Sequence, residues 1–256
     1  MQFSLLGSGS RGNGTLVRSN TTCVLLDCGF SVKDAEARLQ RLGVEPREID
    51  AIIVTHEHSD HIKGVGGFSR KFKTPVYMTK GTYRARDYGQ ITALHEVVPN
   101  ESFCIGDLEV LPVPVSHDAN QPVQYVLSHQ QSHKKLRLGV LTDLGTITQH
   151  VEQMYSSCDA LIVECNHDLD MLAMGSYSYS LKQRVGGHLG HLNNIQTANF
   201  LRRINLGQWQ HLVAAHISEK NNTLDLVKKA LLDGLGKMEQ LVIASQDEGL
   251  DWLKIE

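Results

Sequence analysis

One short segment of the chain concentrates side chains that could bind metal ions. It reads Thr-His-Glu-His-Ser-Asp-His over residues 55–61, in a protein of 256 residues that contains 13 histidines. Residues two apart on an extended backbone point the same way, so His56 and His58 can present their imidazoles to one ion. Asp60 and His61 begin the next turn and can face a second ion. Imidazole and carboxylate ligands suit borderline divalent cations such as zinc, manganese or iron.

A pair of ions needs more ligands than this segment supplies, and the ends of other predicted strands offer them. Taken alone, a histidine at a strand end is more often a hydrogen-bonded structural residue, but the cluster needs partners and reverses that expectation. We predict that His56, His58 and His117 hold the first ion, that Asp60, His61 and His216 hold the second, and that Asp143 bridges both. Two ions ~3.5–4 Å apart hold a shared water and lower its pKa towards neutrality, so that hydroxide is available for hydrolysis.

The elements that must position these side chains are short, fully apolar runs rich in β-branched residues. Such runs predict buried strands at residues 24–26, 52–54, 140–141, 161–163 and 212–214. Asp27, His56, Asp143 and His216 each lie at or just beyond the C-terminal end of one of these runs. In layered α/β folds, chemistry collects in the crevice beyond the strand ends. We therefore expect the four side chains to meet.

Helical periodicity alternates with these strands. Amphipathic helices are predicted at residues 31–43, 145–155, 194–204 and 223–232. Strands are also expected at 108–115, 123–128 and 135–140, the last two joined by a polar turn over residues 129–135. Strand pairs mixed with crossover helices predict a layered α/β architecture, and we expect residues 1–256 to form a single domain.

A short internal repeat suggests that the chain has two related halves. Residues 50–58 (DAIIVTHEH) resemble residues 159–167 (DALIVECNH), and an Asp-x-Gly sequence lies upstream of each copy, at 27–29 and 143–145. We interpret the repeat as two β-rich halves packed face to face, with a cleft where they meet. A chance match of so short a pattern is the alternative.

Composition narrows the classes of protein that the chain can belong to. The formal net charge is -3, which gives no global attraction to nucleic acid. The 5 cysteines form an odd set without a Cys-x-x-Cys pair, which argues against a disulfide framework and favours a reducing, cytoplasmic location. We expect no association with membranes, because no apolar run approaches the ~20 residues needed to span a bilayer.

The His-x-His-x-Asp-His pattern, followed by a lone His, a lone Asp and a C-terminal His, resembles the metallo-β-lactamase fold superfamily along nearly the whole chain. This resemblance implies a four-layer αββα sandwich, with two β-sheets packed face to face and helices outside. Asp27 matches the aspartate that supports the metal-binding loop from behind in that family. The motif is specific for the fold and the metal but not for the substrate, since members cleave β-lactams, thioesters and phosphodiesters.

Finer segments resemble the YycJ/WalJ branch of that superfamily. They are residues 7–13 (GSGSRGN), 165–168 (CNHD), 180–184 (SLKQR), 190–194 (GHLNN) and 215–222 (AHISEKNN). The resemblance implies a relative of the RNase Z and RNase J nucleases that degrades DNA from 5′ to 3′, and it favours DNA over RNA as the nucleic-acid partner. The alternatives are a small-molecule thioester or ester hydrolase of the same fold and a metal-binding protein without catalysis.

Several residues are candidates for contact with a phosphodiester substrate. Ser8, Ser10 and Asn13 lie in a glycine-rich stretch whose N–H groups can bind phosphate, although such a stretch could equally be a simple hairpin turn. Lys182 and Arg184 could hold the substrate backbone or form a solvated helix face. The predicted catalytic residues are Asp60, also a metal ligand, and His191, which could donate a proton to the leaving oxygen.

One stretch of the chain is markedly basic and contains tyrosines. It holds Arg70, Lys71, Lys73, Lys80, Arg84 and Arg86, with Tyr77, Tyr83 and Tyr88 among them. The stretch either binds a nucleic-acid strand by stacking and phosphate contact or is a charged, solvated surface. The pattern assigns no role to His188, and His167 either lines the site or caps a turn.

Overall fold

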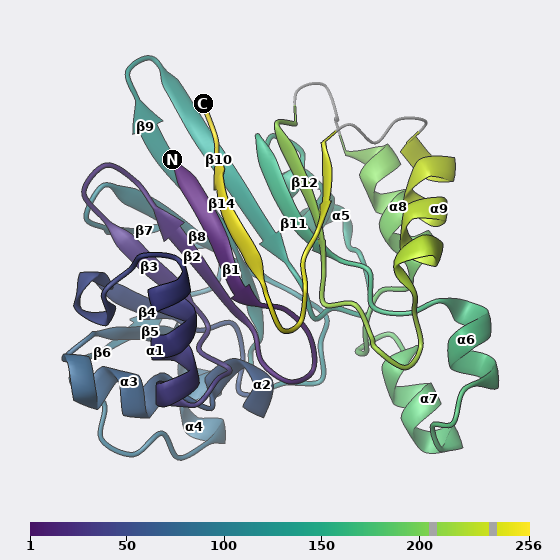
Figure 1. Ribbon diagram of the computed structural model, residues 1–256, viewed down its shortest axis with the longest axis horizontal. Coiled ribbons are helices and arrows are strands. Elements are labelled where there is room, and N and C mark those ends of the chain that lie inside the picture. Colours follow the sequence, from purple (N-terminus) through teal and green to yellow (C-terminus); the bar gives the residue numbers. More distant parts are fainter. Residues whose placement is uncertain (205–208, 236–239) are drawn as a thin grey trace.

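A computed structural model describes residues 1–204, 209–235 and 240–256 and contains two seven-stranded β-sheets (Figure 1). The first sheet, in spatial order, consists of β14 (Leu250–Lys254), β1 (Gln2–Gly7), β2 (Gly14–Arg18), β3 (Cys23–Leu26), β4 (Ala51–Ile53), β5 (Val76–Thr79) and β6 (Leu94–Val97). The second consists of β13 (Leu241–Ile243), β12 (His211–Ala215), β11 (Ala160–Glu164), β10 (Lys134–Leu141), β9 (Val123–Gln131), β8 (Leu108–Pro114) and β7 (Phe103–Ile105).

Helices connect the strands and cover the sheets. Along the chain they are α1 (Val32–Arg41), a 3₁₀ turn η1 (Pro46–Glu48), α2 (Ser59–Ile62), α3 (Val65–Phe72), α4 (Lys80–Ala85), α5 (Gln149–Tyr155), α6 (Leu169–Met174), α7 (Tyr179–Val185), α8 (Asn194–Arg203) and α9 (Leu224–Leu235). Figure 1 shows α1 and α3 beside the first sheet, α8 and α9 beside the second, and α6 and α7 projecting from the end of the molecule.

Alternate apolar residues along each strand pack on opposite faces of the sheet and so belong to different cores. Leu26 and Ile53 of the first sheet pack against Tyr125 and Ile162 of the second, which makes the core between the sheets. Their chain neighbours point to the opposite face, because side chains alternate along a strand. Strands buried on both faces read as continuous apolar runs, which explains why these runs were recognisable in the sequence.

The outer cores lie between each sheet and its helices. On the first sheet, Leu25 and Ile52 pack with Leu39 of α1 and Phe68 of α3. On the second sheet, one cluster includes Leu161 of β11, Val151 of α5, Phe200 of α8 and Leu231 of α9. Three apolar cores between four layers confirm the predicted αββα sandwich.

Two predicted elements have different boundaries in the structure. The helix expected at residues 145–155 begins only at Gln149, because the preceding residues bond to the loop that carries His117: the N–H of Gly145 donates to the carbonyl of Ser116 at 2.9 Å. The turn expected over residues 129–135 is also shorter, since β9 continues to Gln131 and β10 begins at Lys134.

The two copies of the internal repeat occupy equivalent places in the two sheets. Asp50 precedes β4, and its N–H and carboxylate bond to the backbone C=O and N–H of Cys23, each at 2.8 Å. Asp159 precedes β11 and makes the same two bonds, also at 2.8 Å, to the backbone of Arg137. In both copies the strand that follows is parallel to its neighbour, β4 to β3 and β11 to β10. The aspartates therefore fix the same strand register in each half.

Over the residues that the structure describes, no helix is long and apolar enough to cross a lipid bilayer.

Candidate metal centre

Three of the site residues have left-handed backbones at the ends of strands. Asp27 follows β3 with φ 59°, Asp143 lies just beyond β10 with φ 55°, and His216 follows β12 with φ 49°. Positive φ is uncommon for residues other than glycine, and such outliers concentrate at functional sites. Each kink ends its strand and turns the chain at one end of the sheets, which is where the predicted ligands gather.

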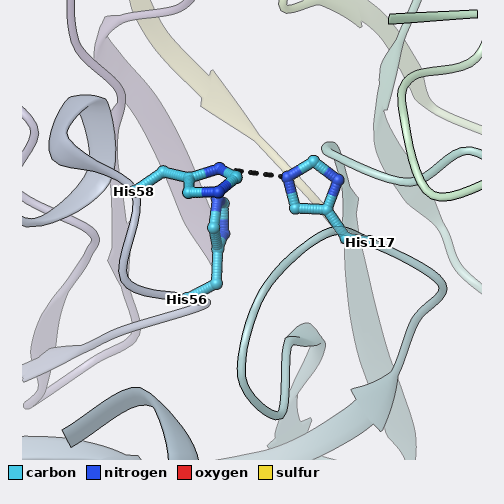
Figure 2. Close-up of side chains that lie close together, drawn as sticks. All are labelled: His56, His58 and His117. Atoms are coloured by element: carbon cyan, nitrogen blue, oxygen red, sulfur yellow. Dashed lines mark hydrogen bonds between the residues drawn. The ribbon is translucent and has the colours of Figure 1, made fainter. Parts of the chain in front are cut away.

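His56, His58 and His117 form the first group of donors. Each offers a ligand atom within 4.8 Å of the others, and Nε2 of His117 lies 3.2 Å from Nδ1 of His58 (Figure 2). Nδ1 of His117 lies 3.1 Å from the carbonyl of Gly190, so an N–H there can donate and orient the ring. Burial lowers the pKa of both His56 and His117. Low pKa values keep the rings neutral, which is the form that binds metal.

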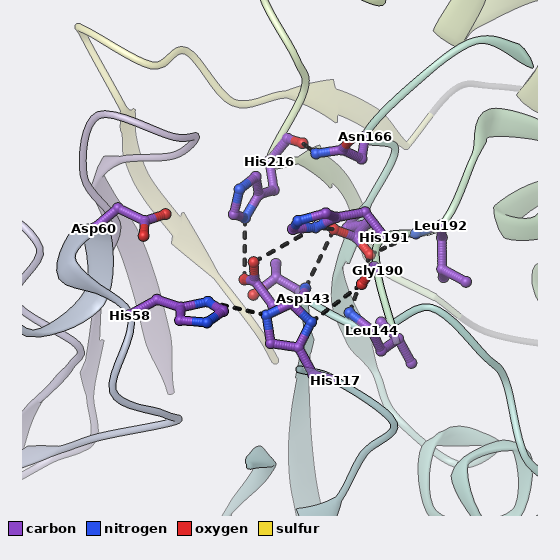
Figure 3. Close-up of polar contacts among 12 residues, drawn as sticks. His58, Asp60, His117, Asp143, Leu144, Asn166, Gly190, His191, Leu192 and His216 are labelled. Atoms are coloured by element: carbon purple, nitrogen blue, oxygen red, sulfur yellow. Dashed lines mark hydrogen bonds and ion pairs between the residues drawn. The ribbon is translucent and has the colours of Figure 1, made fainter. Parts of the chain in front are cut away.

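Asp143 belongs to two further groups, one with His56 and His61 and one with His191 and His216. Its Oδ2 lies 3.0 Å from Nδ1 of His216 (Figure 3) and 3.3 Å from Nε2 of His61. Burial opposes ionisation of Asp143, but His216 and His61 hold its pKa well below the ordinary value. The carboxylate is therefore charged and surrounded by imidazoles.

The donor set fits divalent metal ions. Nε2 of His56 is buried and has no hydrogen-bond partner among the described residues, although a buried ring nitrogen normally has one. His61 is equally buried; despite that burial, Asp143 and Asp60 raise its pKa well above the ordinary value. A bound cation would take the place of the proton on this ring and pair with the same carboxylates.

For two predicted site residues, the donor groups of the structure differ from the predicted ligand sets. Asp60 approaches His61, with Oδ2 3.5 Å from Nε2, but it belongs to none of the three donor groups found in the described residues. Its role as a ligand and in catalysis stays a prediction. His191, predicted to transfer a proton, lies within one of these groups, beside Asp143 and His216, and its role in proton transfer also stays a prediction.

Asp27 supports the metal-binding loop through buried hydrogen bonds. Its carboxylate accepts the backbone N–H of Thr55 at 2.9 Å and the hydroxyl of Thr55 at 2.8 Å, and Oδ2 lies 2.7 Å from Nδ1 of His61. Through these bonds Asp27 fixes the start of the loop and the orientation of one predicted ligand.

The glycine-rich stretch contributes mainly to the architecture of the site. Ser8 is buried, and its hydroxyl accepts the N–H of His216 at 2.9 Å. Asn13 is also buried and donates to Oδ2 of Asp60 at 3.2 Å. Ser10 is exposed and lines the cavity beside the donors. The predicted contacts of Ser8 and Asn13 with substrate compete with these internal bonds.

Glu164 is a central residue that the sequence interpretation missed. It is fully buried at the end of β11, and its carboxylate accepts the N–H groups of Asp143 and Leu144, each at 3.2 Å, and of Leu192 at 2.8 Å. It also lies 3.0 Å from Nδ1 of His191. Burial lowers the pKa of His191, but Glu164 outweighs this and raises it to about 9. Glu164 follows an apolar run, and the strand-end rule applied to that run would have found it.

The glycines of the two Asp-x-Gly sequences allow loops to approach closely. A Cβ on Gly29 would lie 1.6 Å from the carbonyl oxygen of Asp60. A Cβ on Gly145 would lie 2.4 Å from the carbonyl oxygen of Gly187 and 2.5 Å from the nitrogen of Gly190. Each half therefore needs glycine at this position to seat a loop of the site.

A cavity of about 410 Å³ opens beside the donors and is lined by Asp60, Asp143, His191 and His216. Arg184 lines it from α7. Lys182, the other predicted cation of this helix, donates to the carbonyl of Ala173 at 2.7 Å and is absent from the lining.

The two unassigned histidines differ in environment. His167 is buried, which lowers its pKa to about 4, and it lies outside the three donor groups of the described chain. His188 is exposed, and its carbonyl accepts the hydroxyl of Thr146 at 2.9 Å. Neither side chain is placed as a ligand.

Comparison with known proteins matches residues 22–217 to the beta-lactamase superfamily domain. The chain is 34% identical over 235 residues to exodeoxyribonuclease YycJ of Bacillus anthracis, covering 90% of this chain and 88% of the relative. It is 31% identical to exodeoxyribonuclease WalJ of Streptococcus pneumoniae, covering 93% and 89%. The fold matches that of the metallo-beta-lactamase fold protein YhfI from Bacillus subtilis with a TM-score of 0.72 at 16% identity, covering 98% of both chains. The chain belongs to the beta-lactamase superfamily.

Proposed function

We propose that this protein is a dinuclear metal-dependent phosphodiesterase, specifically an exonuclease that degrades DNA from 5′ to 3′ with zinc or manganese. The observation that carries the proposal is the place of Asp143, which is shared by a donor group with His61 and a donor group with His216. One carboxylate can serve two ions because it has two oxygens. The names of the relatives that match nearly the whole chain, exodeoxyribonucleases YycJ and WalJ, support DNA as the substrate.

The proposed chemistry is hydrolysis of a phosphodiester by activated water. Two divalent ions, when bound, lower the pKa of a water and neutralise the charge of the phosphate. The protein supplies the positions of the ligands. His117 is oriented by the carbonyl of Gly190, and His61 is oriented by Asp27. Rigid ligands keep the attacking and leaving groups in line, which is where much of the rate of such enzymes arises.

His191 is the proposed general acid. In the metal-free protein Glu164 raises its pKa to about 9, and its Nδ1 lies 3.0 Å from the Glu164 carboxylate, to which an N–H there can donate. The ring lines the cavity, so the N–H on Nε2 can protonate the leaving oxygen of a substrate bound there. Glu164 orients the ring through this contact.

The cavity favours an anionic substrate over a neutral ester. Arg86 and Arg184 both line it, together with Asp60, Asp118 and Asp143, whose negative charges bound metal ions would offset. Cations gathered in a cleft attract phosphate more than they attract an uncharged acyl group. This local charge favours the phosphodiesterase over the alternative thioester or ester hydrolase.

Incubation of the metal-loaded protein with DNA labelled at its 5′ or 3′ end tests the proposal. We expect mononucleotides to be released in the presence of manganese or zinc, with the 5′ label released first. Asp143→Ala is the matched control and should release none. Turnover of a thioester without cleavage of any phosphodiester would contradict the proposal and establish the alternative.

A further inference from the structure

The cavity beside the metal centre has a second wall that metal binding does not use. Arg86 follows α4, Tyr177 lies just before α7, and Arg184 lies within α7. Figure 1 shows α4 and α7 at the same end of the two sheets. We call these three lining residues, which belong to none of the metal donor groups, the second wall; they supply two cations and an aromatic ring from segments about 90 residues apart in the chain.

Arg184 is held in place by a carboxylate that also faces the metal donors. Its Nε donates to Oδ2 of Asp118 at 2.5 Å. Oδ1 of the same aspartate lies 3.6 Å from Nε2 of His58 and 3.5 Å from Nε2 of His117. The ion pair ties the guanidinium to the first donor group. The two terminal nitrogens of Arg184 have no hydrogen-bond partner among the described residues, and the side chain is 61% exposed. They can therefore donate to a ligand.

Tyr177 adds an aromatic surface to this wall. Its side chain is half-buried, and Nζ of Lys220 lies 5.7 Å from the centre of its ring. An aromatic ring flanked by cations is the arrangement by which proteins bind single strands, since bases stack on the ring while cations contact phosphates. A neutral acyl substrate would not need it.

The basic stretch of the sequence divides in the structure. Arg86 lines the cavity. Arg70 instead donates to the carbonyls of Tyr88 and Gln90, and Lys71 pairs with Glu36 at 2.7 Å. Arg84 is exposed on α4 and is absent from the cavity lining. Of these basic residues, Arg86 belongs to the cavity, whereas Arg70, Lys71 and Arg84 do not. The stretch therefore divides between the two interpretations that the sequence allowed, a nucleic-acid contact and a charged surface.

We propose that Arg86, Tyr177 and Arg184 form a nucleotide subsite that binds one unpaired nucleotide next to the scissile phosphate. The ring of Tyr177 stacks on the base, and the guanidinium of Arg184, fixed by Asp118, binds the phosphate. A cavity of about 410 Å³ lies within the size range of ligand pockets, which is enough for one nucleotide. The proposal rests on the proposed function and specifies how that site binds DNA.

Binding and catalysis can be measured separately to test this subsite. Binding is measured with a fluorescent single-stranded DNA oligonucleotide with phosphorothioate linkages, by anisotropy, on metal-loaded protein. Chemistry at the metal centre is measured with bis(p-nitrophenyl) phosphate, a diester too small to need the subsite. The variants are Arg184→Ala and Tyr177→Ala. The matched controls are Arg84→Ala on α4 and Tyr179→Ala, whose side chains are exposed and absent from the cavity lining.

We expect Arg184→Ala and Tyr177→Ala each to raise the dissociation constant of the oligonucleotide at least about 10-fold. For both variants the loss on the oligonucleotide should exceed the loss on the small diester at least about fivefold, whereas the control variants should match the wild type in both measurements. Wild-type affinity for the oligonucleotide in both variants would overturn the proposal, and so would an equal loss on the small diester, because the residues would then act on the metal centre. If the wild type binds DNA but cleaves no phosphodiester, the proposed function fails, while the dissociation constants still decide the subsite.

Discussion

The two halves of the molecule build the same frame and use it differently. Asp27 and Asp143 occupy equivalent places, each left-handed, each within an Asp-x-Gly sequence and each just beyond a strand. In the first half, the carboxylate of Asp27 accepts the N–H of Thr55, which lies just beyond the neighbouring strand β4. In the second half the direction is reversed, since Glu164, at the position equivalent to Thr55, accepts the N–H of Asp143.

This reversal shows how a duplicated frame can give two functions. The supporting carboxylate lies on Asp27 in the first half and on Glu164 in the second. Asp143 is thereby released from support and faces the imidazoles of His61 and His216. The position of Asp143 follows from the frame that both halves share. Its proposed role as a metal ligand depends on the supporting carboxylate lying on Glu164 instead.

Substitution of Asp143 should give the largest loss of activity, and it should exceed the loss caused by substitution of Asp27. We expect Asp143→Ala to lower hydrolysis by more than about 1,000-fold, because both donor groups lose a member. Asp27→Asn should cost only about 10–100-fold, as for other residues that orient ligands through hydrogen bonds. Steady-state rates on DNA and circular dichroism measure the two effects. Equal losses in the two folded variants would contradict the division of roles.

The two glycines should also differ in how much they tolerate a side chain. A Cβ on Gly29 meets backbone at 1.6 Å, against 2.4 Å for Gly145, so Gly29→Ala should destabilise the protein more. Overpacking of this kind costs about 1–3 kcal/mol, and we expect Gly29→Ala at or above the upper end. Urea denaturation measures the free energy of unfolding.

Gly43→Ala is the control for backbone strain alone. Its φ is 68°, but a Cβ there meets no atom within 4 Å. A destabilisation by Gly29→Ala no greater than that of Gly43→Ala would show that close approach of the Asp60 loop is unimportant.

Removing the charge of Glu164 tests the support in the second half. Glu164→Gln keeps the shape of the side chain but weakens four contacts at once, to Asp143, Leu144, Leu192 and His191. We expect a loss of about 10–100-fold in kcat/KM and weaker metal retention on dialysis. Glu96→Gln, at an exposed position of β6, is the control. Unchanged metal content and activity in Glu164→Gln would refute the role of this carboxylate.

The last prediction concerns how the stability of the second half depends on pH. Because the pKa of His191 is raised to about 9 in the folded protein, its protonation stabilises the fold fully below the unfolded value of about 6.5. This contribution is lost as the pH rises through 9 and amounts to at most about 3 kcal/mol. In EDTA-treated protein, His191→Gln should therefore be less stable than the wild type at pH 6, with the gap closing towards pH 10. A gap that stays constant with pH would argue against the His191–Glu164 pair.

The sequence predicted the first half of the site better than the second. His56, His58, Asp60 and His61 lie within one short segment. Alternation along an extended backbone relates His56 to His58, and the turn into α2 carries Asp60 and His61. The layers were also predictable, because strands buried on both faces are continuously apolar. Features that depend on residues close together in the chain could therefore be predicted from the sequence.

Contacts that depend on topology could not be predicted in this way. Asp118 and Arg184 are separated by 66 positions and meet only because the loop after β8 lies against α7. Glu164 reaches His191 because the chain returns to the same sheet edge after α7. Both contacts depend on how loops pack at the ends of strands, for which the sequence has no local pattern.

Metal content, measured by elemental analysis of the purified, metal-loaded protein and of Asp143→Ala, tests most directly whether one carboxylate joins the two halves around a pair of cations. We predict about two divalent ions per chain in the wild type and fewer than about one in the variant, since the bridge belongs to both ligand sets. A single ion in the wild type, or two ions retained without Asp143, would contradict the account.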